Sequence, residues 1–328
     1  MVKNNNIKIL ISGGAGYIGS VISHHFKKNQ ILFSIVDNKK NINVNSFPKN
    51  TKIFRGDISD KALLKKIFNE FEPTHILHLA AFINVGESER YKSKYQINNI
   101  FKGKIFVDFF IKKKVKNFLF SSSAAVYSNR SNKKVESLKE KPANYYGKTK
   151  LDFENYLFQQ KKKYNLNIII LRFFNVVGAH YALKSGNPSL ESKNLFSSIC
   201  KSILKKKIFK IDCNFFPTRD GTAIRDFIDI NDIAKIIITL LRKKIIKYKV
   251  FNIGNGVGHT VLEVVRLFEK IIQKKLYIKF LKRNTGASNI VSNNKSIKKL
   301  YPWKLTPLKD SIITHYNFYK KILGRKKY

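Results

Sequence analysis

Short, strongly apolar runs alternate along this chain with longer segments in which apolar residues recur every three or four positions. The short runs are rich in β-branched and aromatic residues and cover 7–12, 31–36, 75–80, 117–122 and 167–173. Continuous apolar runs of this length are typical of parallel strands buried on both faces. The longer segments have the period of amphipathic helices and lie at 17–28, 59–70, 89–113 and 144–164. This alternation predicts an α/β fold with a doubly wound parallel sheet.

Beyond Gly178 the pattern loosens and becomes mixed in type. We expect a helix near 192–206, strands near 208–212 and 224–229, and helices from 231 and from 260. The chain is therefore predicted to have two domains. They are a sheet domain at 1–180 and a smaller mixed α/β domain at 181–328, with segments near 224–240 and 249–256 returning to the first.

The charge of the chain is strongly unbalanced. Its 328 residues include 64 Lys and Arg against 21 Asp and Glu, which gives a formal net charge of +43. Such a charge attracts nucleic acids and anionic membranes. Only ten of the basic residues are arginine, however, and the lysines are spread through every segment, which is typical of a solvated surface. We therefore expect no specific nucleic-acid partner.

The sequence contains few of the features that would direct a protein to a membrane or let it bind a metal. No run approaches 18 uncharged apolar residues and no apolar leader precedes the first glycines, so we expect no membrane association and a cytoplasmic protein. Cys200 and Cys213 are too few for a disulfide framework or a structural zinc site. The seven histidines are not at ligand spacing, so we expect no metal.

A glycine-rich turn directly follows the first predicted strand. In "GGAGYIG", Gly13, Gly16 and Gly19 fall where a tight turn, a close backbone approach to a pyrophosphate and helix packing on the sheet favour glycine. The helix that starts there directs N–H groups toward phosphates. Asp37 closes the second strand, where a carboxylate binds a ribose diol and repels a 2′-phosphate. These features predict a Rossmann-type domain that binds NAD rather than NADP.

The segment "NYYGKTKL" places Tyr146 and Lys150 one helical turn apart, with Cβ atoms roughly 6 Å from each other. A phenol of pKa ~10 needs about 4 kcal/mol of selective stabilisation to ionise near pH 7. An ammonium group at ~6 Å supplies about 3 kcal/mol at an effective dielectric of ~20. An oxidised nicotinamide would supply the remainder. We interpret the pair as an acid/base group tuned beside a positively charged cofactor.

Three serines end a central strand in "FSSSAAVY". Ser121, Ser122 and Ser123 leave the carboxyl edge of the predicted sheet, where ligands of such folds bind. Ser123 is placed to exchange a proton with Tyr146. No Gly-x-Ser-x-Gly elbow surrounds the serines, so nucleophilic catalysis is not expected.

In these motifs the chain resembles the extended short-chain dehydrogenases/reductases and, among them, the UDP-glucose 4-epimerase family. The likeness runs along nearly the whole chain. It includes "GGAGYIGS", "VDN", "GDI", "VGES", "FSSSAAVY", "YYGKTKL", "LRFFNVVGAH", "PTRDGTAIRDFIDINDIA" and "FNIGNGVGHTVLEVV". Related dehydratases carry Asp-Glu after the central strand, whereas Ala124 and Ala125 stand in that region here.

The resemblance implies inversion at C4 of a UDP-hexose with no net oxidation. Tyr146 as phenolate would take the proton of the 4-hydroxyl while NAD accepts hydride from C4. The 4-keto sugar would then turn and take the hydride back on its other face. Lys150 would bind the nicotinamide ribose and lower the pKa of Tyr146, and Ser123 would bridge Tyr146 to the substrate oxygen.

The resemblance also implies two sets of binding residues, one for the cofactor and one for the substrate. The cofactor set is Gly13, Gly16, Tyr17, Ile18, Gly19, Asp37, Asn38, Asp57, Ile58, Leu79, Ala80, Ala81, Asn98, Ser121, Tyr146, Lys150 and Phe173. The substrate set is Ser123, Tyr146, Asn175, Asn194, Leu195, Arg225 and Arg283.

Some positions depart from the family pattern. Ile83 replaces a cofactor-facing lysine, Val176 replaces a proline, and Asp212 lies on a strand whose backbone cradles uracil in relatives. Arg283 is shifted by one residue relative to the family arginine, and Ala287 replaces an acid that follows it.

The sugar pocket differs as well. Val291 falls near the position of a tyrosine that excludes N-acetylated sugars, which predicts that UDP-N-acetylglucosamine and UDP-N-acetylgalactosamine are also accepted. A UDP-glucuronate 4-epimerase or a nucleotide-sugar reductase would share the catalytic residues and differ in this pocket. A non-catalytic NAD-binding protein would usually lack the tyrosine.

The apolar faces of helices 89–113 and 144–164 are predicted to be core. Their members include Ile97, Phe101, Ile105, Phe153 and Leu157. In relatives these two helices pair across a two-fold axis, so a homodimer is the expectation.

Overall fold

The computed structural model describes residues 7–127, 133–138, 140–187, 194–213, 216–243, 249–282, 287–301 and 304–324. The chain divides into two compact units. The first unit comprises residues 1–128, 136–173 and 234–251, and the second comprises 129–135, 174–233 and 252–328. Residues 234–251 therefore return to the first unit after a long excursion through the second.

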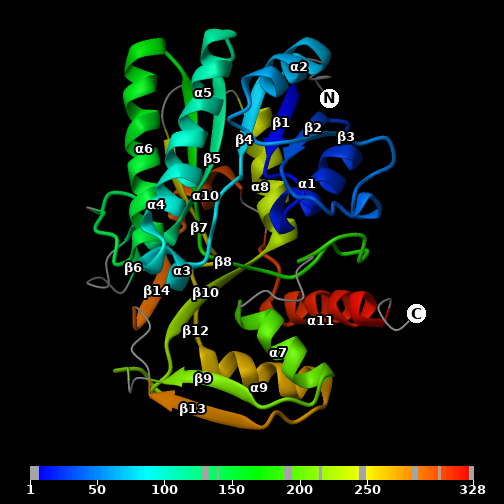
Figure 1. Cartoon of the computed structure of the whole chain (residues 1–328). Coiled ribbons are helices and arrows are strands. Elements are labelled where there is room, and N and C mark those ends of the chain that lie inside the picture. The colour runs from blue at the N-terminus through cyan, green and yellow to red at the C-terminus, as the bar shows by residue number, and fades with distance from the viewer. Residues whose placement is uncertain are drawn as a thin grey trace. The chain divides into compact units, whose positions relative to one another are not determined.

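A seven-stranded sheet of order β11-β7-β5-β4-β1-β2-β3 forms the centre of the first unit (Figure 1). Its strands are β1 (Lys8–Ser12), β2 (Leu32–Asp37), β3 (Lys52–Arg55), β4 (His75–His78), β5 (Asn117–Ser123), β7 (Asn167–Phe173) and β11 (Lys249–Ile253). All pairings from β7 to β3 are parallel. The order reverses between β1 and β4, since β2 and β3 lie on one side of β1 and β4 and β5 on the other. The predicted doubly wound parallel sheet is confirmed.

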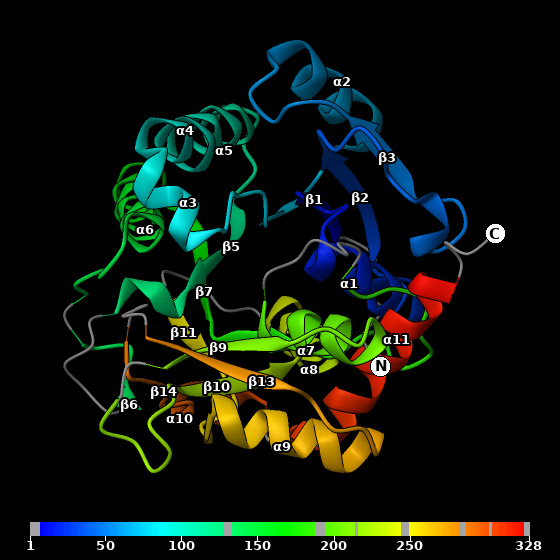
Figure 2. The ribbon, with the colours of Figure 1, turned by 60° about the horizontal axis from the view of Figure 1, so that its bottom comes forward.

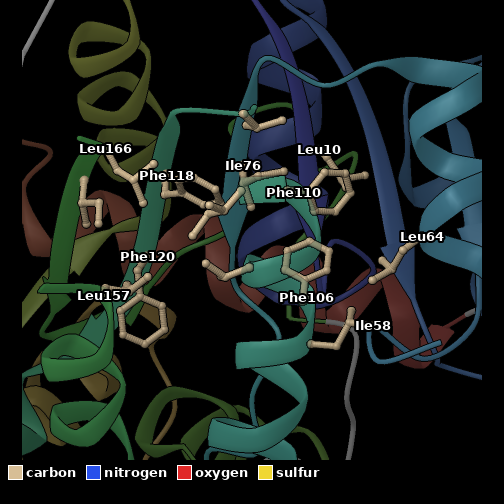
Figure 3. Packing of buried hydrophobic residues seen from close by; sticks show 14 of the residues in the cluster. Leu10, Ile58, Leu64, Ile76, Phe106, Phe110, Phe118, Phe120, Leu157 and Leu166 are labelled. Carbon is tan, nitrogen blue, oxygen red and sulfur yellow. The ribbon is translucent and has the colours of Figure 1, made fainter. Parts of the chain in front are cut away.

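Helices connect the strands of this sheet. They are α1 (Tyr17–Lys28), α2 (Lys61–Phe71), α3 (Val85–Arg90), α4 (Lys92–Gln96), α5 (Lys102–Lys112), α6 (Tyr145–Tyr164) and α8 (Ile230–Arg242). Short 3-10 turns lie at η1 (Val44–Ser46) and η3 (Ala124–Val126). Side chains from α2, α5 and α6 cover one face of the sheet, and Figure 3 shows the rings of Phe106 and Phe110 directed at Leu10 and Ile76 of the strands.

The predicted single helix at 89–113 is instead a series of segments. Tyr91 has φ −122° and ψ 57°, outside the helical region, and this separates α3 from α4. A π-helical turn, η2 (Ile97–Phe101), then joins α4 to α5. This series lies beside α6 in both Figure 1 and Figure 2. The interruptions rotate the helix face, so the apolar period of the sequence does not give the burial of each residue.

Burial on these helices differs from the prediction in part. Phe153 and Leu157 are buried, as expected. Ile97, Phe101 and Ile105 are 50%, 49% and 38% exposed, so their assignment to the core is wrong for the single chain. Ile97 and Phe101 lie in the π turn, whose wider winding changes the angle between successive side chains from that of an α-helix.

The second unit has two smaller sheets. One has the order β12-β10-β14-β6 with β8 also paired to β10, and the other pairs β13 with β9. Their strands are β6 (Lys133–Lys134), β8 (Asn175–Val177), β9 (Phe209–Cys213), β10 (Ile224–Asp229), β12 (Gly258–Thr260), β13 (Ile278–Lys282) and β14 (Asn289–Ser292). The helices are α7 (Leu195–Leu204), α9 (Val261–Ile272), α10 (Lys295–Leu300) and α11 (Leu308–Gly324).

The core of the second unit is formed by α7, α9 and α11 around Phe196, Phe268 and Tyr319. Across the described part of both units, no helix is both long and apolar enough to span a bilayer.

Candidate active site

A cavity of about 300 Å³ lies in the first unit, where β1, β2, β3 and β4 end. Thirteen of the residues that we assigned to the cofactor line it. These are Gly13, Gly16, Tyr17, Ile18, Gly19, Asp37, Asn38, Asp57, Ile58, Leu79, Ala80, Ala81 and Asn98. Ile83, which the resemblance places at a cofactor-facing position, also lines it. Three further lining residues were missed, namely Lys39, Gly56 and Phe82. They directly follow or precede predicted residues, so extending each motif by one or two positions would have found them.

The glycine turn of this cavity has the geometry that a dinucleotide needs. Gly13 has φ +69°, and a Cβ there would lie 2.6 Å from the Ala80 backbone, so a larger residue would close the cavity wall. Helix α1 starts at Tyr17 with Gly16 as its N-cap, without a side-chain cap and without an acidic residue in its first turn. The positive end of the helix therefore faces the cavity and suits a pyrophosphate.

Two carboxylates lie at the edge of the cavity in different environments. Asp37 accepts hydrogen bonds from the backbone N–H groups of Ala15 and Lys39, both at 2.9 Å. Asp57 accepts a hydrogen bond from the Lys102 ammonium at 2.5 Å. The backbone bonds fix the Asp37 side chain at the end of β2, where a ribose hydroxyl would meet it.

A second group of predicted residues gathers at the carboxyl end of β5 and the start of α6. The Lys150 ammonium donates to the Ser121 carbonyl at 2.7 Å and lies 5.9 Å from the centroid of the Tyr146 ring. The Tyr146 hydroxyl interacts with the hydroxyl of Ser123. Phe173 is buried at the end of the neighbouring strand, in register with Ser123.

Close packing positions the start of α6. Asn144 caps the helix by accepting from the Gly147 N–H at 2.8 Å, and Ser88 accepts from the Tyr146 N–H at 3.0 Å. A Cβ at Gly147 would lie 2.1 Å from the Ala125 carbonyl oxygen. Glycine at this position therefore allows α6 to lie directly against η3, which brings Tyr146 to Ser123.

Asn99 joins the two groups within the first unit. Its side chain accepts from the Phe82 N–H at 2.8 Å and donates to the Phe82 carbonyl at 3.0 Å. The same amide donates to the Thr149 hydroxyl at 3.2 Å. Phe82 lines the cavity and Thr149 precedes Lys150, so the wall of the cavity is tied to the helix that carries the tyrosine and lysine.

Burial dominates the ionisation of the Tyr146 and Lys150 side chains. It raises the pKa of Tyr146 to about 12, and the interaction with Ser123 lowers this pKa only in part. Burial also lowers the pKa of Lys150 to about 7, although the Glu154 carboxylate raises it. Without a cofactor, desolvation outweighs any effect of the ammonium because it penalises both charged forms. That Lys150 and an oxidised nicotinamide together lower the pKa of Tyr146 stays a prediction.

A buried ion pair between Arg172 and Glu154 lies next to this site and supports it. Arg172, which is 1% exposed, donates to Glu154 at 2.6 and 3.1 Å and to the Tyr127 hydroxyl at 2.9 Å. Glu154 also accepts from Ser122, which lies between the two serines that contact Lys150 and Tyr146. The network fixes β5, β7 and α6 relative to one another.

Four of the predicted substrate residues lie in the second unit. Asn175 donates to the Asp226 carbonyl at 3.0 Å, and Asn194 caps α7, which begins at Leu195. Arg225 donates to the Ile224 carbonyl at 2.8 Å, and burial lowers the pKa of its guanidinium to about 10. Within the described ranges, no carboxylate pairs with this guanidinium. Arg283 lies outside the described residues.

The positions that depart from the family pattern differ in their burial. Ile83 lines the cavity and is 71% exposed. Val176 pairs with Ile228 in β8, whereas Asp212 lies opposite Leu281 in the two-stranded sheet. Ala287 and Val291 are buried. A Cβ at Gly258 would lie 2.7 Å from Val291, so Val291 packs tightly on β12.

Among the residues that the structure places, no group of three or more His, Cys, Asp or Glu side chains could hold a metal ion. His78, which lies 2.6 Å from the Ser12 hydroxyl just before the glycine turn, is packed against Phe106, Phe120 and Phe153, and burial lowers its pKa to about 3.

A parallel sheet with a glycine turn at its switch point defines a Rossmann-type dinucleotide-binding protein. Residues 9–254 match the model of the NAD dependent epimerase/dehydratase family. The chain belongs to this family.

Known proteins extend the similarity to nearly the whole chain. It is 34% identical to a UDP-glucose 4-epimerase of Yersinia pestis over 293 residues, which cover 85% of this chain and 86% of that protein. It is 32% identical to a bifunctional UDP-glucose 4-epimerase and UDP-xylose 4-epimerase 1 of Pisum sativum, with coverages of 90% and 91%. The crystal structure of a UDP-glucose 4-epimerase from Bifidobacterium longum in complex with NAD+ and UDP superposes with a TM-score of 0.91, 27% identity and coverages of 96% and 98%.

Proposed function

We propose that this protein is a UDP-hexose 4-epimerase that interconverts UDP-glucose and UDP-galactose with NAD as its resident cofactor. The observation that carries the proposal is the placement of Tyr146. Its hydroxyl meets Ser123, and its helix is tied through Thr149 and Asn99 to the wall of the dinucleotide cavity. A proton-transfer group and the cavity that would hold a hydride carrier thus lie at one edge of one sheet.

The chemistry is reversible oxidation and reduction at C4 of the sugar. When bound, NAD supplies the hydride acceptor and donor. Tyr146 takes the proton of the 4-hydroxyl as the carbon is oxidised and returns it when the 4-keto sugar is reduced on its opposite face. Ser123 holds the sugar oxygen beside the phenol, and Lys150 binds the nicotinamide ribose. The configuration at C4 inverts and no net oxidation occurs.

Binding of NAD is assigned to the residues of the first unit. The cavity would hold the dinucleotide, with the start of α1 for its pyrophosphate and Asp37 for its ribose. Asp57 and Ile58 would hold the adenine ring. Ser121 and Phe173, which end neighbouring strands, would hold the nicotinamide side.

Substrate binding is assigned to the second unit. Arg225 is the strongest candidate for the diphosphate, because a buried guanidinium without a carboxylate partner in the described ranges is stabilised by an anionic ligand. Asn175, Asn194, Leu195 and Arg283 complete the proposed nucleotide-sugar site.

The sugar pocket is proposed to accept N-acetylated hexoses as well. Val291 is a small side chain at a position where a tyrosine would occupy more volume, and it is buried against β12 rather than projecting into solvent. Replacing Val291 with Tyr should reduce turnover of UDP-N-acetylglucosamine more than turnover of UDP-glucose. Turnover of UDP-glucose without any turnover of the acetylated sugar by the natural protein would contradict this assignment.

We also propose a cytoplasmic homodimer. Its interface is the apolar surface formed by Ile97, Phe101, Ile105 and Phe158, which are 38–50% exposed on adjacent helices. Sedimentation should give the mass of a dimer, and Phe101→Glu should give a monomer. Lys61→Glu, on exposed α2, is the control and should remain dimeric. The free, buried Cys200 suits the reducing cytoplasm.

The experiment that tests the function is a substrate panel without added cofactor. Purified protein is incubated separately with UDP-glucose, UDP-N-acetylglucosamine and UDP-glucuronate, and the 4-epimer of each is sought by chromatography. UDP-galactose formed from UDP-glucose supports the proposal. Turnover of UDP-glucuronate alone would assign a UDP-glucuronate 4-epimerase, and NAD bound without any turnover would assign a non-catalytic binding protein.

A further inference from the structure

The ion pair of Lys102 and Asp57 joins two elements beside the dinucleotide cavity. Lys102 is the first residue of α5, and Asp57 follows β3. The ammonium nitrogen lies 2.5 Å from Asp57 Oδ2, and the two side chains are only 30% and 29% exposed. The other carboxylate oxygen, Oδ1, accepts from the Ser59 N–H at 2.9 Å and from the Ser59 hydroxyl at 2.7 Å.

Hydrogen bonds therefore hold both oxygens of the Asp57 carboxylate. Burial raises the pKa of Asp57, but Lys102 and Ser59 together lower it below its ordinary value. The carboxylate is therefore ionised at neutral pH and acts only as a hydrogen-bond acceptor. Partial burial of the pair limits the solvent screening that weakens exposed ion pairs.

Lys102 contacts a residue of the cavity wall without lining the cavity itself. Asp57 and Asn98 both line the cavity, whereas Lys102 is not part of its lining. Asn98 belongs to the π turn that ends immediately before Lys102. The ion pair therefore connects Asp57 to the turn that carries Asn98, and these two lining residues are far apart in the sequence. Turns of the π type are frequent at functional sites.

We infer that Lys102 is a positioning residue that makes the cofactor site selective for a purine bearing an exocyclic amino group. This inference rests on the proposed placement of adenine at Asp57. An sp² oxygen has two acceptor positions, and Lys102 uses one of those on Oδ2. The remaining position accepts from a 6-amino group. A purine with a 6-oxo group would instead place a carbonyl oxygen, which is also a hydrogen-bond acceptor, against the fixed Asp57 carboxylate. The carbonyl and the carboxylate would then each lack a hydrogen bond.

The test compares two dinucleotides that differ only at this position of the purine. Release of radiolabelled NAD from the intact protein is followed in competition with unlabelled NAD or with nicotinamide hypoxanthine dinucleotide. The natural protein should prefer NAD by roughly ten- to a hundredfold. Lys102→Met should reduce the preference to less than about threefold, Lys102→Arg should retain most of it, and Asp57→Asn should abolish it. Lys112→Met, at an exposed position of the same helix, is the matched control.

The outcomes distinguish a positioning role of Lys102 from a merely structural one. Equal weakening of both dinucleotides in Lys102→Met, with the ratio preserved, would show a merely structural role and overturn the inference. Absence of discrimination in the natural protein would overturn it too. Failure of the natural protein to bind either dinucleotide would instead contradict the proposed cofactor site.

Discussion

Lys150 lies one helical turn beyond Tyr146 on α6, with its ammonium nitrogen 5.9 Å from the centroid of the tyrosine ring. The Ser121 carbonyl holds that ammonium at 2.7 Å. Burial moves both side chains toward their neutral forms, with a pKa of about 12 for Tyr146 and about 7 for Lys150. Ionising the tyrosine at pH 7 then requires about 7 kcal/mol of stabilisation rather than the 4 kcal/mol of an exposed phenol. Positive charge supplied by an oxidised nicotinamide would therefore be central to the proposed reaction.

The buried Lys150 should make stability depend on pH. Its pKa falls from the ordinary 10.5 to about 7 in the fold, so between these values the unfolded chain binds a proton that the folded chain does not. Its contribution therefore rises from pH 7 toward 10.5 and is lost as the pH falls through 7. Lys150→Met removes this titration. Urea unfolding of nucleotide-free protein should show the natural protein gaining roughly 2–3 kcal/mol relative to the variant between pH 7 and 9.5. Parallel pH dependences would contradict the assignment.

Gly147→Ala tests the contact that positions α6. Alanine in a helix normally stabilises relative to glycine, but here the added Cβ would lie 2.1 Å from the Ala125 carbonyl oxygen. We expect a loss of about 1–3 kcal/mol in unfolding free energy and a displaced helix start. Turnover should fall by at least about tenfold because Tyr146 moves away from Ser123. Lys148→Ala, an exposed change in the same turn, should alter neither. Increased stability of Gly147→Ala would disprove the packing argument.

The Glu154 and Arg172 pair gives a prediction with an internal control. Glu154→Leu leaves the Arg172 guanidinium, which is 1% exposed, with Glu140 as its remaining carboxylate partner, and should cost up to about 3–5 kcal/mol of stability. The double variant Glu154→Leu with Arg172→Met removes both charges and should recover most of this loss. Denaturant unfolding of the four proteins in the cycle measures the coupling. Additive losses would show that the two charges do not depend on each other.

Local signals in the sequence predicted the sheet and most of the cofactor site. The spacing of Gly13, Gly16 and Gly19 after an apolar run, and an aspartate at the end of the next strand, depend only on neighbouring residues. The roles of Lys102 and Asn99 were not readable in this way. Lys102 meets Asp57 across 45 residues, and Asn99 meets Thr149 across 50, so both contacts depend on how α5 and α6 pack on the sheet.

Burial was the other property that the sequence could not give. The sequence correctly predicts that Tyr146 and Lys150 are neighbours on one helix face, but it does not show that burial penalises the charged forms of both. Helix α11 was not predicted at all. Its apolar positions are interspersed with lysines, and the high lysine content of the whole chain reduces the contrast between helical and irregular segments.

Tyr146→Phe tests the account most directly, with Tyr145→Phe as its matched control in the adjacent position. Both variants keep the ring and remove one hydroxyl, but only the Tyr146 hydroxyl meets Ser123. The measurement is the initial rate of UDP-galactose formation from UDP-glucose, together with the NAD content of each purified protein. We predict that Tyr146→Phe retains NAD and loses turnover by about 10²- to 10⁴-fold, whereas Tyr145→Phe stays near the natural rate. Turnover by Tyr146→Phe within a few-fold of the natural protein would show that another group moves the proton.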